Sequence, residues 1–207
     1  VLGVYTNASE KNVKYTCTSA SKGTFTASTK VSGTPQYAYY PYSTDNASRN
    51  ATGLKGSLPQ DQTAAKNGYL PYDYRYGVQT GVNSDGDVEY DMHSVLANVL
   101  FTVETAGSAL EGQEIVSVTC KVTRDGAAVP VCGGFSFSAA DGAYSYDNNT
   151  TYNEFTTAAY ATIFPTVKSG DVLEITAKSA AAEASVTMTV EGEVVAGGYY
   201  EVTVQLP

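Results

Sequence analysis

The sequence has no tryptophan, two methionines and a single histidine among its 207 residues. Because His93 is the only histidine, a Ser-His-Asp or Cys-His site would have to include it, and no Gly-x-Ser-x-Gly turn marks a nucleophile. We therefore interpret His93 as a side chain satisfied by local hydrogen bonds. No apolar run approaches the length of a membrane span, and no charged-then-apolar leader is visible. Val1 opens directly inside a strand pattern, so we expect the natural N-terminus to lie upstream of it.

Cysteine is also scarce. Cys17, Cys120 and Cys132 are an odd number without a C-x-x-C pair, which excludes a disulfide framework and gives no zinc spacing. We predict three buried, reduced thiols, and a single Cys120–Cys132 bridge is the alternative.

Positive charge is the third deficit. The chain has 12 Lys and Arg against 21 Asp and Glu, for a net charge of −9, and the basic residues do not cluster. A surface of this kind is poorly suited to phosphate groups. We therefore expect no nucleic acid and no anionic membrane surface among the partners.

The composition favours strands, since Thr, Val, Tyr and Ser are abundant and 19 glycines are scattered through the chain. Period-two alternation and frequent turn signals without helical spacing predict an all-β chain of antiparallel sandwiches. Strands are predicted at Val1–Tyr5, Val13–Thr18, Thr24–Thr26, Val88–His93, Asn98–Glu104, Glu114–Val122, Ala128–Cys132, Phe135–Ser138, Ala158–Phe164, Val172–Lys178, Ser185–Val190 and Tyr199–Leu206. The small, polar segment 106–113 suggests two domains, residues 1–105 and 106–207.

The segment Asn83–Asp87 has oxygen-bearing side chains at every second position, as a calcium loop would. The match fails because Val88 stands where a calcium loop needs glycine and Ser94 where it needs glutamate. We predict an Asp-Gly hairpin turn instead. The carboxylates of Asp85, Asp87, Glu89 and Asp91 would share one face of a strand. Two of them could act as the catalytic pair of a glycoside hydrolase. The simpler interpretation is that they belong to an edge strand whose charges prevent pairing with a further strand.

Seventeen tyrosines without tryptophan allow a surface that stacks on sugars. We predict a long polar loop at Asp141–Thr157, and its Tyr144, Tyr146 and Tyr152 are the candidate residues for such a glycan-binding module. The alternative is that tyrosines fill outer strand faces, where an apolar ring with a polar tip is favoured.

The segment Tyr37–Ser43 is interpreted as an edge or terminating strand, because Pro41 removes a ladder donor. With Gly56–Gln62, His93–Phe101, Gly3–Thr6, Ala161–Pro165 and Val195–Tyr200, it resembles, in order and spacing, the fimbrillin-like proteins, the type V pilus subunits of Bacteroidales. The segments that carry the resemblance span nearly the whole chain.

The resemblance implies two antiparallel transthyretin-like β-sandwich domains with Greek-key-type connections and no enzymatic activity, cofactor or metal. It implies an exported lipoprotein at the cell surface and outer membrane, attached only through a lipid anchor on a precursor segment. Family members lose a first strand to an arginine-specific protease and accept a strand donated by another pilus subunit. Host or bacterial surface ligands are further implied partners.

Strand donation requires an open groove with unpaired backbone groups. The polymerisation groove is predicted beside the first and last strands. Its residues would be Val1, Val4, Tyr5, Tyr200, Val202, Val204 and Leu206.

Overall fold

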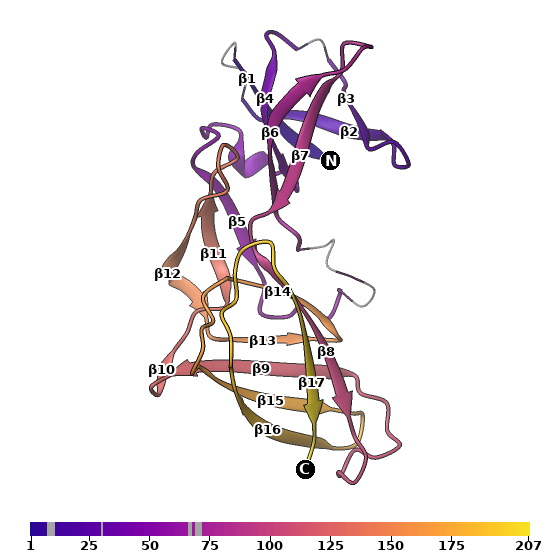
Figure 1. The fold of residues 1–207 in the computed structure, drawn as a ribbon, viewed down its shortest axis with the longest axis vertical. Helices are drawn as coiled ribbons and strands as arrows, with labels where there is room; N and C mark the ends of the chain where they lie inside the picture. The colour runs from indigo at the N-terminus through magenta and orange to yellow at the C-terminus, as the bar shows by residue number, and fades with distance from the viewer. Residues whose placement is uncertain (8–10, 30, 66–67, 69–71) are drawn as a thin grey trace. The chain divides into compact units, whose positions relative to one another are not determined.

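The structure is a computed structural model that describes residues 1–7, 11–29, 31–65, 68 and 72–207 (Figure 1). These residues form seventeen strands and one short 3-10 helix, Thr44–Asn46, so the predicted all-β class is confirmed. Within the described part of the chain, no helix is long and apolar enough to cross a membrane. The chain divides into unit 1, which comprises Val1–Gly56, Asp73–Val95 and Phe135–Ser145, and unit 2, which comprises Ser57–Tyr72, Leu96–Gly134 and Tyr146–Pro207.

Unit 1 contains a six-stranded sheet in the order β3-β2-β1-β4-β6-β7, and the neighbouring strands are antiparallel. Its strands are β1 (Leu2–Thr6), β2 (Val13–Ser19), β3 (Thr24–Ala27), β4 (Pro35–Tyr40), β6 (Arg75–Val82) and β7 (Val88–Ser94). The predicted termination of the tyrosine-rich strand is confirmed, because β4 ends at Tyr40. Its predicted edge position is wrong, because β4 lies between β1 and β6.

The hairpin predicted at the Asp-Gly pair is confirmed between β6 and β7. Gly86 has φ +86, a conformation that favours glycine, and its N–H donates to the Asn83 carbonyl at 3.1 Å. The Asn83 side chain also accepts from the N–H groups of Asp85 and Asp87. The Asn83 side-chain oxygen, a candidate calcium ligand, therefore already accepts two backbone hydrogen bonds.

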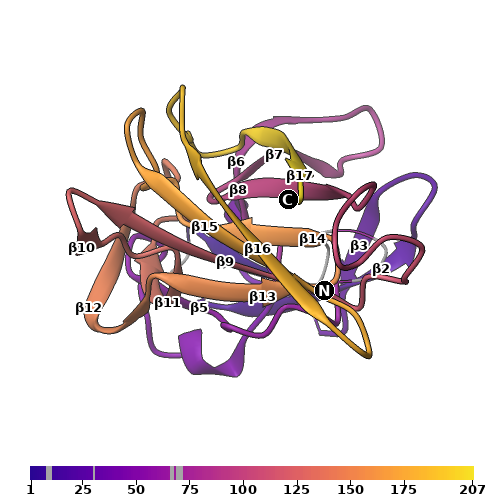
Figure 2. The same ribbon diagram turned by 90° about the horizontal axis from the view of Figure 1, so that it is seen from below.

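Unit 2 contains two sheets that pack over a shared core and appear as separate layers with crossing strands (Figures 1 and 2). One has the order β10-β9-β15-β16, with β13 also paired to β9, and the other has the order β14-β8-β17. Their strands are β8 (Ala97–Glu104), β9 (Ser117–Arg124), β10 (Ala127–Ala128), β13 (Glu154–Thr157), β14 (Tyr160–Ile163), β15 (Val172–Lys178), β16 (Glu183–Thr189) and β17 (Tyr199–Gln205). The rings of Phe101 and Phe155, one from each sheet, lie 6.0 Å apart. Most neighbouring strands are antiparallel, but β17 runs parallel to β8, which differs from the predicted antiparallel arrangement.

A third sheet has the order β12-β11-β5, built from β12 (Tyr144–Tyr152), β11 (Cys132–Phe137) and β5 (Leu54–Leu58). Each of these strands has residues in both units. The polar loop predicted at Asp141–Thr157 is therefore wrong, because that segment holds β12 and β13. Most residues of β12 are exposed, so backbone hydrogen bonds rather than burial hold it in the sheet. Its mostly polar side chains lack the apolar alternation that predicts a strand.

The predicted division between residues 105 and 106 stays a prediction about folding domains. The two units are each built from several stretches of chain. Strand β8, which precedes that division, pairs with β14 and β17, which follow it.

The prediction of buried thiols is confirmed for Cys120 and Cys132 and wrong for Cys17, which is exposed on β2. Burial, with a smaller contribution from Glu154, raises the pKa of each buried thiol to about 12. All three cysteines are free, so the alternative bridge is not formed.

Candidate functional site

Strand β1 carries two of the predicted groove residues, Val4 and Tyr5, and lies between β2 and β4 in its sheet. Leu2 lies opposite Tyr15 of β2 and Gly3 opposite Tyr39 of β4, so both edges of β1 are occupied. All five residues of β1 are buried, whereas Val1 before it is 41% exposed. Strand β1 therefore offers no free edge, and the ends of its sheet are β3 and β7.

The six-stranded sheet is strongly curled. A flat sheet would separate β3 from β7 by five strand spacings, about 24 Å. Yet Phe25 of β3 and Met92 of β7 both pack against one small cluster formed by Leu2, Val4 and Ala38. The two ends of the sheet therefore bend toward the same interior, which makes the sheet a half-open barrel with β3 and β7 at its rims.

The interior of this half-barrel has an apolar lining that is only half-buried. Five side chains surround the buried cluster in this way, namely Tyr15, Phe25, Tyr40, Tyr90 and Met92. We call these five residues the interior lining. Gly77 leaves room for one of them, since a Cβ there would lie 2.4 Å from the Met92 sulfur.

The hydroxyl of Tyr90 is buried in this interior and has no hydrogen-bond partner among the described residues. Burial, and then the neighbouring Tyr15, raises the pKa of Tyr90. A buried polar group without a partner costs about 1–3 kcal/mol, so this hydroxyl marks a place where an additional hydrogen-bonding group would be stabilising.

The opposite face of the same sheet is closed by aromatic rings. Tyr39 lies 6.3 Å from Tyr5 and 6.0 Å from Phe137, and Tyr74 lies 4.9 Å from Phe135. The Tyr39 hydroxyl also donates to Asn12 at 2.5 Å and accepts from the Ser43 N–H at 3.1 Å. The tyrosine-rich strand is therefore structural, and the side chain of Tyr5 belongs to this closed face.

Strand β17 carries the remaining predicted groove residues and lies at the end of its sheet. Val204 and Leu206 are buried, Tyr200 and Val202 are half-buried, and the intervening side chains are exposed, so the predicted apolar face is confirmed. The Leu206 N–H donates to the backbone carbonyl of Glu104, and the Asn98 N–H donates to the backbone carbonyl of Gly198. In a parallel ladder this register directs the backbone groups of even-numbered residues toward β8 and those of odd-numbered residues toward the open edge.

The seven predicted groove residues are divided between the two units. The structure assigns Val1, Val4 and Tyr5 to unit 1, and Tyr200, Val202, Val204 and Leu206 to unit 2. A groove made from both sets stays a prediction. The interior lining was missed, although alternation at Val13–Cys17 and Val88–Met92 carries a signal for it.

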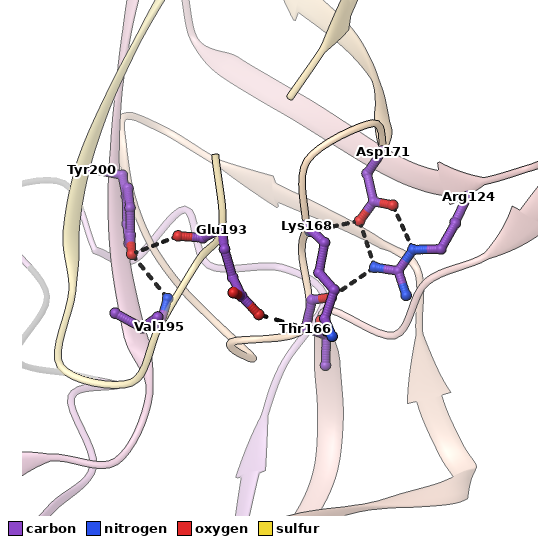
Figure 3. A network of polar contacts seen from close by, with 7 residues as sticks. All are labelled: Arg124, Thr166, Lys168, Asp171, Glu193, Val195 and Tyr200. Carbon is purple, nitrogen blue, oxygen red and sulfur yellow. Dashed lines mark hydrogen bonds and ion pairs between the residues drawn. The ribbon is translucent and has the colours of Figure 1, made fainter. Parts of the chain in front are cut away.

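A polar network fixes the loop that leads into β17 (Figure 3). The Tyr200 hydroxyl accepts from the Val195 N–H at 2.8 Å and donates to the Glu193 carbonyl at 3.2 Å. Glu193 also forms an ion pair with Lys168 at 3.8 Å. These contacts hold the middle of the loop between β16 and β17 against Tyr200 of β17 and against Lys168.

Next to this loop, Arg124 forms a two-point ion pair with the buried Asp171 (Figure 3). Arg124 Nε donates to Asp171 Oδ1 at 2.6 Å and Nη2 donates to Oδ2 at 2.8 Å. The Lys168 N–H donates to the same carboxylate at 2.8 Å. The Arg124 hydrogen bonds are the main reason that the pKa of Asp171 lies below its usual range.

The three tyrosines predicted to form a glycan platform differ in exposure. Tyr144 is half-buried, whereas Tyr146 and Tyr152 are exposed. The Tyr146 ring stacks on Phe164, with a centroid separation of 6.0 Å and an interplanar angle of 14°. One face of that ring is therefore occupied, and Tyr152 is the stronger candidate for a ligand.

The predicted acidic row lies on and before the sheet-end strand β7. Glu89 and Asp91 are exposed there, and His93 Nε2 lies 3.4 Å from the Asp91 carboxylate and packs against the Tyr76 ring. This arrangement agrees with the local interpretation of His93. The described residues contain no cluster of three or more His, Cys, Asp or Glu side chains placed to hold a metal ion.

Comparison with known proteins gives a family match and three structural matches. Residues 4–207 match the sequence family described as Fimbrillin-like. A crystal structure of a candidate cell adhesion protein from Bacteroides thetaiotaomicron is 14% identical, with a TM-score of 0.53, and the match covers 99% of this chain and 78% of that chain. Candidate cell adhesion proteins from Bacteroides fragilis and Bacteroides eggerthii match with the same coverage, at 12% and 11% identity and TM-scores of 0.40 and 0.38. No curated protein matches the chain. At 14% identity, the first structure supports the fold alone.

Proposed function

Since the chain belongs to the fimbrillin-like family, we propose that it is a structural and adhesive subunit of a cell-surface pilus that assembles by donation of β-strands between subunits. The fimbrillin-like adhesion family is non-catalytic, and we extend this to the chain. We also propose that the chain forms two transthyretin-like β-sandwich domains. It places the protein outside the cell, held at the outer membrane by a lipid anchor on a precursor segment.

The observation that carries strand donation is the half-open barrel of unit 1. Its interior lining is half-buried, and two of the four strands that carry it, β3 and β7, are the ends of the sheet. A donated strand with apolar side chains at alternate positions would cover the interior lining with one face. Its backbone would pair with a rim strand, as in other cases of strand addition.

The occupant we propose is a terminal strand of another subunit. The strand pattern of β17 shows the chemistry required, because its alternate apolar residues already cover a sheet interior in unit 2. This proposal changes the predicted groove in two ways. Val4 is part of the wall of the acceptor groove. The donated strand cannot pair with β1, because β1 is already paired on both sides.

A synthetic peptide with the sequence Tyr199–Leu206 tests the proposal. We expect the peptide to raise the thermal unfolding temperature of the protein in a concentration-dependent way, because a ligand that binds only the folded state stabilises it. Hydrogen exchange should slow in β3 and β7. A control peptide with serine in place of Val202 and Val204 should do neither.

Two results would overturn this assignment. One is that neither peptide changes the unfolding temperature. The other is that the peptide protects the outer edge of β17 and leaves β3 and β7 unchanged, which would move the acceptor to unit 2.

A further inference from the structure

Unit 2 has a cleft of about 420 Å³ on its surface, and the described residues that line it all belong to this unit. Its walls come from the segment after β5, the end of β10 and the segment that follows it, the middle and end of β12, and the start of β13. The residues that line it are Gln60, Ala128, Pro130, Asn148, Thr151, Tyr152, Asn153 and Glu154. The volume lies within the range of small-molecule sites and is large enough for one or two pyranose rings.

The lining combines one exposed aromatic ring with short polar side chains. Tyr152 is 47% exposed, so a large part of its ring is available to a ligand. Around it stand the carboxamides of Gln60, Asn148 and Asn153, each of which has both donor and acceptor atoms. Adjacent hydroxyl groups on a sugar ring need such paired donors and acceptors, and the apolar face of the sugar needs an aromatic ring.

Charge narrows the class of ligand. Among the residues that the structure describes, no lysine or arginine lines the cleft, and Glu154 is the one charged residue of the lining. A carboxylate accepts hydrogen bonds from hydroxyl groups but repels phosphate, sulfate and carboxylate groups. The lining therefore favours an uncharged, hydroxyl-rich ligand over an anionic one.

The backbone of the cleft is held in place before any ligand binds. The carbonyl of Tyr152 accepts from the Val131 N–H at 2.8 Å, and the carbonyl of Gln60 accepts from the Thr156 N–H at 2.7 Å. The Asn153 side chain donates to the Val122 carbonyl at 3.2 Å. A prearranged wall reduces the ordering cost of binding. In contrast, the Gln60 side chain makes a long hydrogen bond of 3.4 Å to the Glu154 carbonyl, which a sugar hydroxyl can replace.

We propose that this cleft binds a neutral saccharide, with Tyr152 stacking on the sugar ring and with Asn148, Gln60 and Glu154 hydrogen-bonding its hydroxyl groups. The site supplies an adhesive contact that does not depend on strand donation. It also replaces the predicted platform of three tyrosines by a single ring in a polar cleft.

The first test is a microarray of neutral, sialylated and sulfated glycans probed with the full chain. We expect binding to neutral glycans and weaker or no binding to their sialylated and sulfated counterparts. Absence of binding to any neutral glycan would overturn the proposal, as would a preference for the anionic counterparts.

The second test titrates the strongest neutral glycan from the array against three variants. Tyr152→Ala should weaken binding about tenfold, because it removes the stacking ring. Glu154→Gln should retain measurable binding and make the matched sialylated glycan a better ligand. Tyr199→Ala, a matched change of a tyrosine that is 52% exposed and outside the cleft, should leave affinity unchanged.

Unchanged affinity in Tyr152→Ala would overturn the assignment, and so would an equal loss in Tyr199→Ala. The unfolding temperature of each variant shows whether it is folded. The binding of the Tyr199–Leu206 peptide to each variant distinguishes the saccharide site from strand donation. A variant that loses sugar binding but still binds the peptide is impaired only in the cleft.

Discussion

The two units solve the same problem, how to cover the apolar face of a sheet, to different extents. In unit 2 two sheets face each other, and Phe155, Ile175 and Val204 are almost fully buried between them. In unit 1 the curled sheet buries Leu2, Val4 and Ala38 but leaves its interior lining half-buried. The difference shows that an alternating sequence determines which face of a strand is apolar, without determining whether a second layer covers that face.

The largest expected contrast is between two phenylalanines, one in each unit. Phe155→Ala should lower the free energy of unfolding by about 3–5 kcal/mol, because Phe155 is buried between two sheets. Phe25→Ala on the rim strand β3 should cost only about 1 kcal/mol, because that ring is already half-exposed. Urea denaturation of both variants measures the difference. Equal losses would mean that the half-barrel is closed in solution.

A pair of proline substitutions in β17 tests whether the well-covered unit 2 nevertheless has an open sheet edge. Val202→Pro removes a backbone donor directed at β8 and should cost about 2–3 kcal/mol. Thr203→Pro removes a donor directed at the open edge and should cost less than about 1 kcal/mol. Thermal unfolding distinguishes the two. If Thr203→Pro is the more damaging change, another strand covers that edge.

The ion pair of unit 2 should appear in the pH dependence of stability. Asp171 has a lowered pKa in the folded protein, so its contribution is present above its unfolded pKa of about 3.9 and is lost as the pH falls through the folded value. Asp171→Asn should cost about 2 kcal/mol at neutral pH and flatten the acid part of the profile. Denaturation measured between neutral and acidic pH tests this. A profile parallel to that of the parent protein would argue against the assignment.

The smallest effect is expected from Tyr90→Phe. Removing a buried hydroxyl that has no partner should be neutral, or stabilise unit 1 by up to about 1 kcal/mol. Tyr39→Phe is the matched control on the closed face of the same sheet, and it should cost about 1–2 kcal/mol because Tyr39 is hydrogen-bonded to Asn12 and Ser43. A similar loss in both variants would show that Tyr90 has a partner within the half-barrel.

The sequence was informative wherever a strand has one apolar and one polar face. The apolar residues of β17 and the turn at Asn83 were predicted because alternation and the Asp-Gly pair are local signals. The parallel pairing of β17 with β8 was not, because alternation does not encode the partner strand. Strand β12 was missed for a related reason, since its mostly exposed Ser, Asp, Asn and Thr residues lack a buried face.

The candidate sites were predictable only in part. Val4 was expected at a groove, but the curl that turns it into the wall of an interior depends on contacts between β3, β7 and β1, which are distant in sequence. Tyr152 was named among three tyrosines, and only the fold shows that it lines a cleft while Tyr146 stacks on Phe164.

The division of the chain has a consequence for the order of synthesis. The chain passes between the units after residues 56, 72, 95, 134 and 145. Unit 1 therefore lacks Phe135 and Phe137, which close one face of its sheet, until two thirds of the chain has been made. An N-terminal fragment that ends at residue 105 exposes that face, so chaperones that hold unfolded chains should bind the fragment more strongly than the full-length protein. The last stretch of unit 1 ends at Ser145, whereas unit 2 is complete only once β17 has been made.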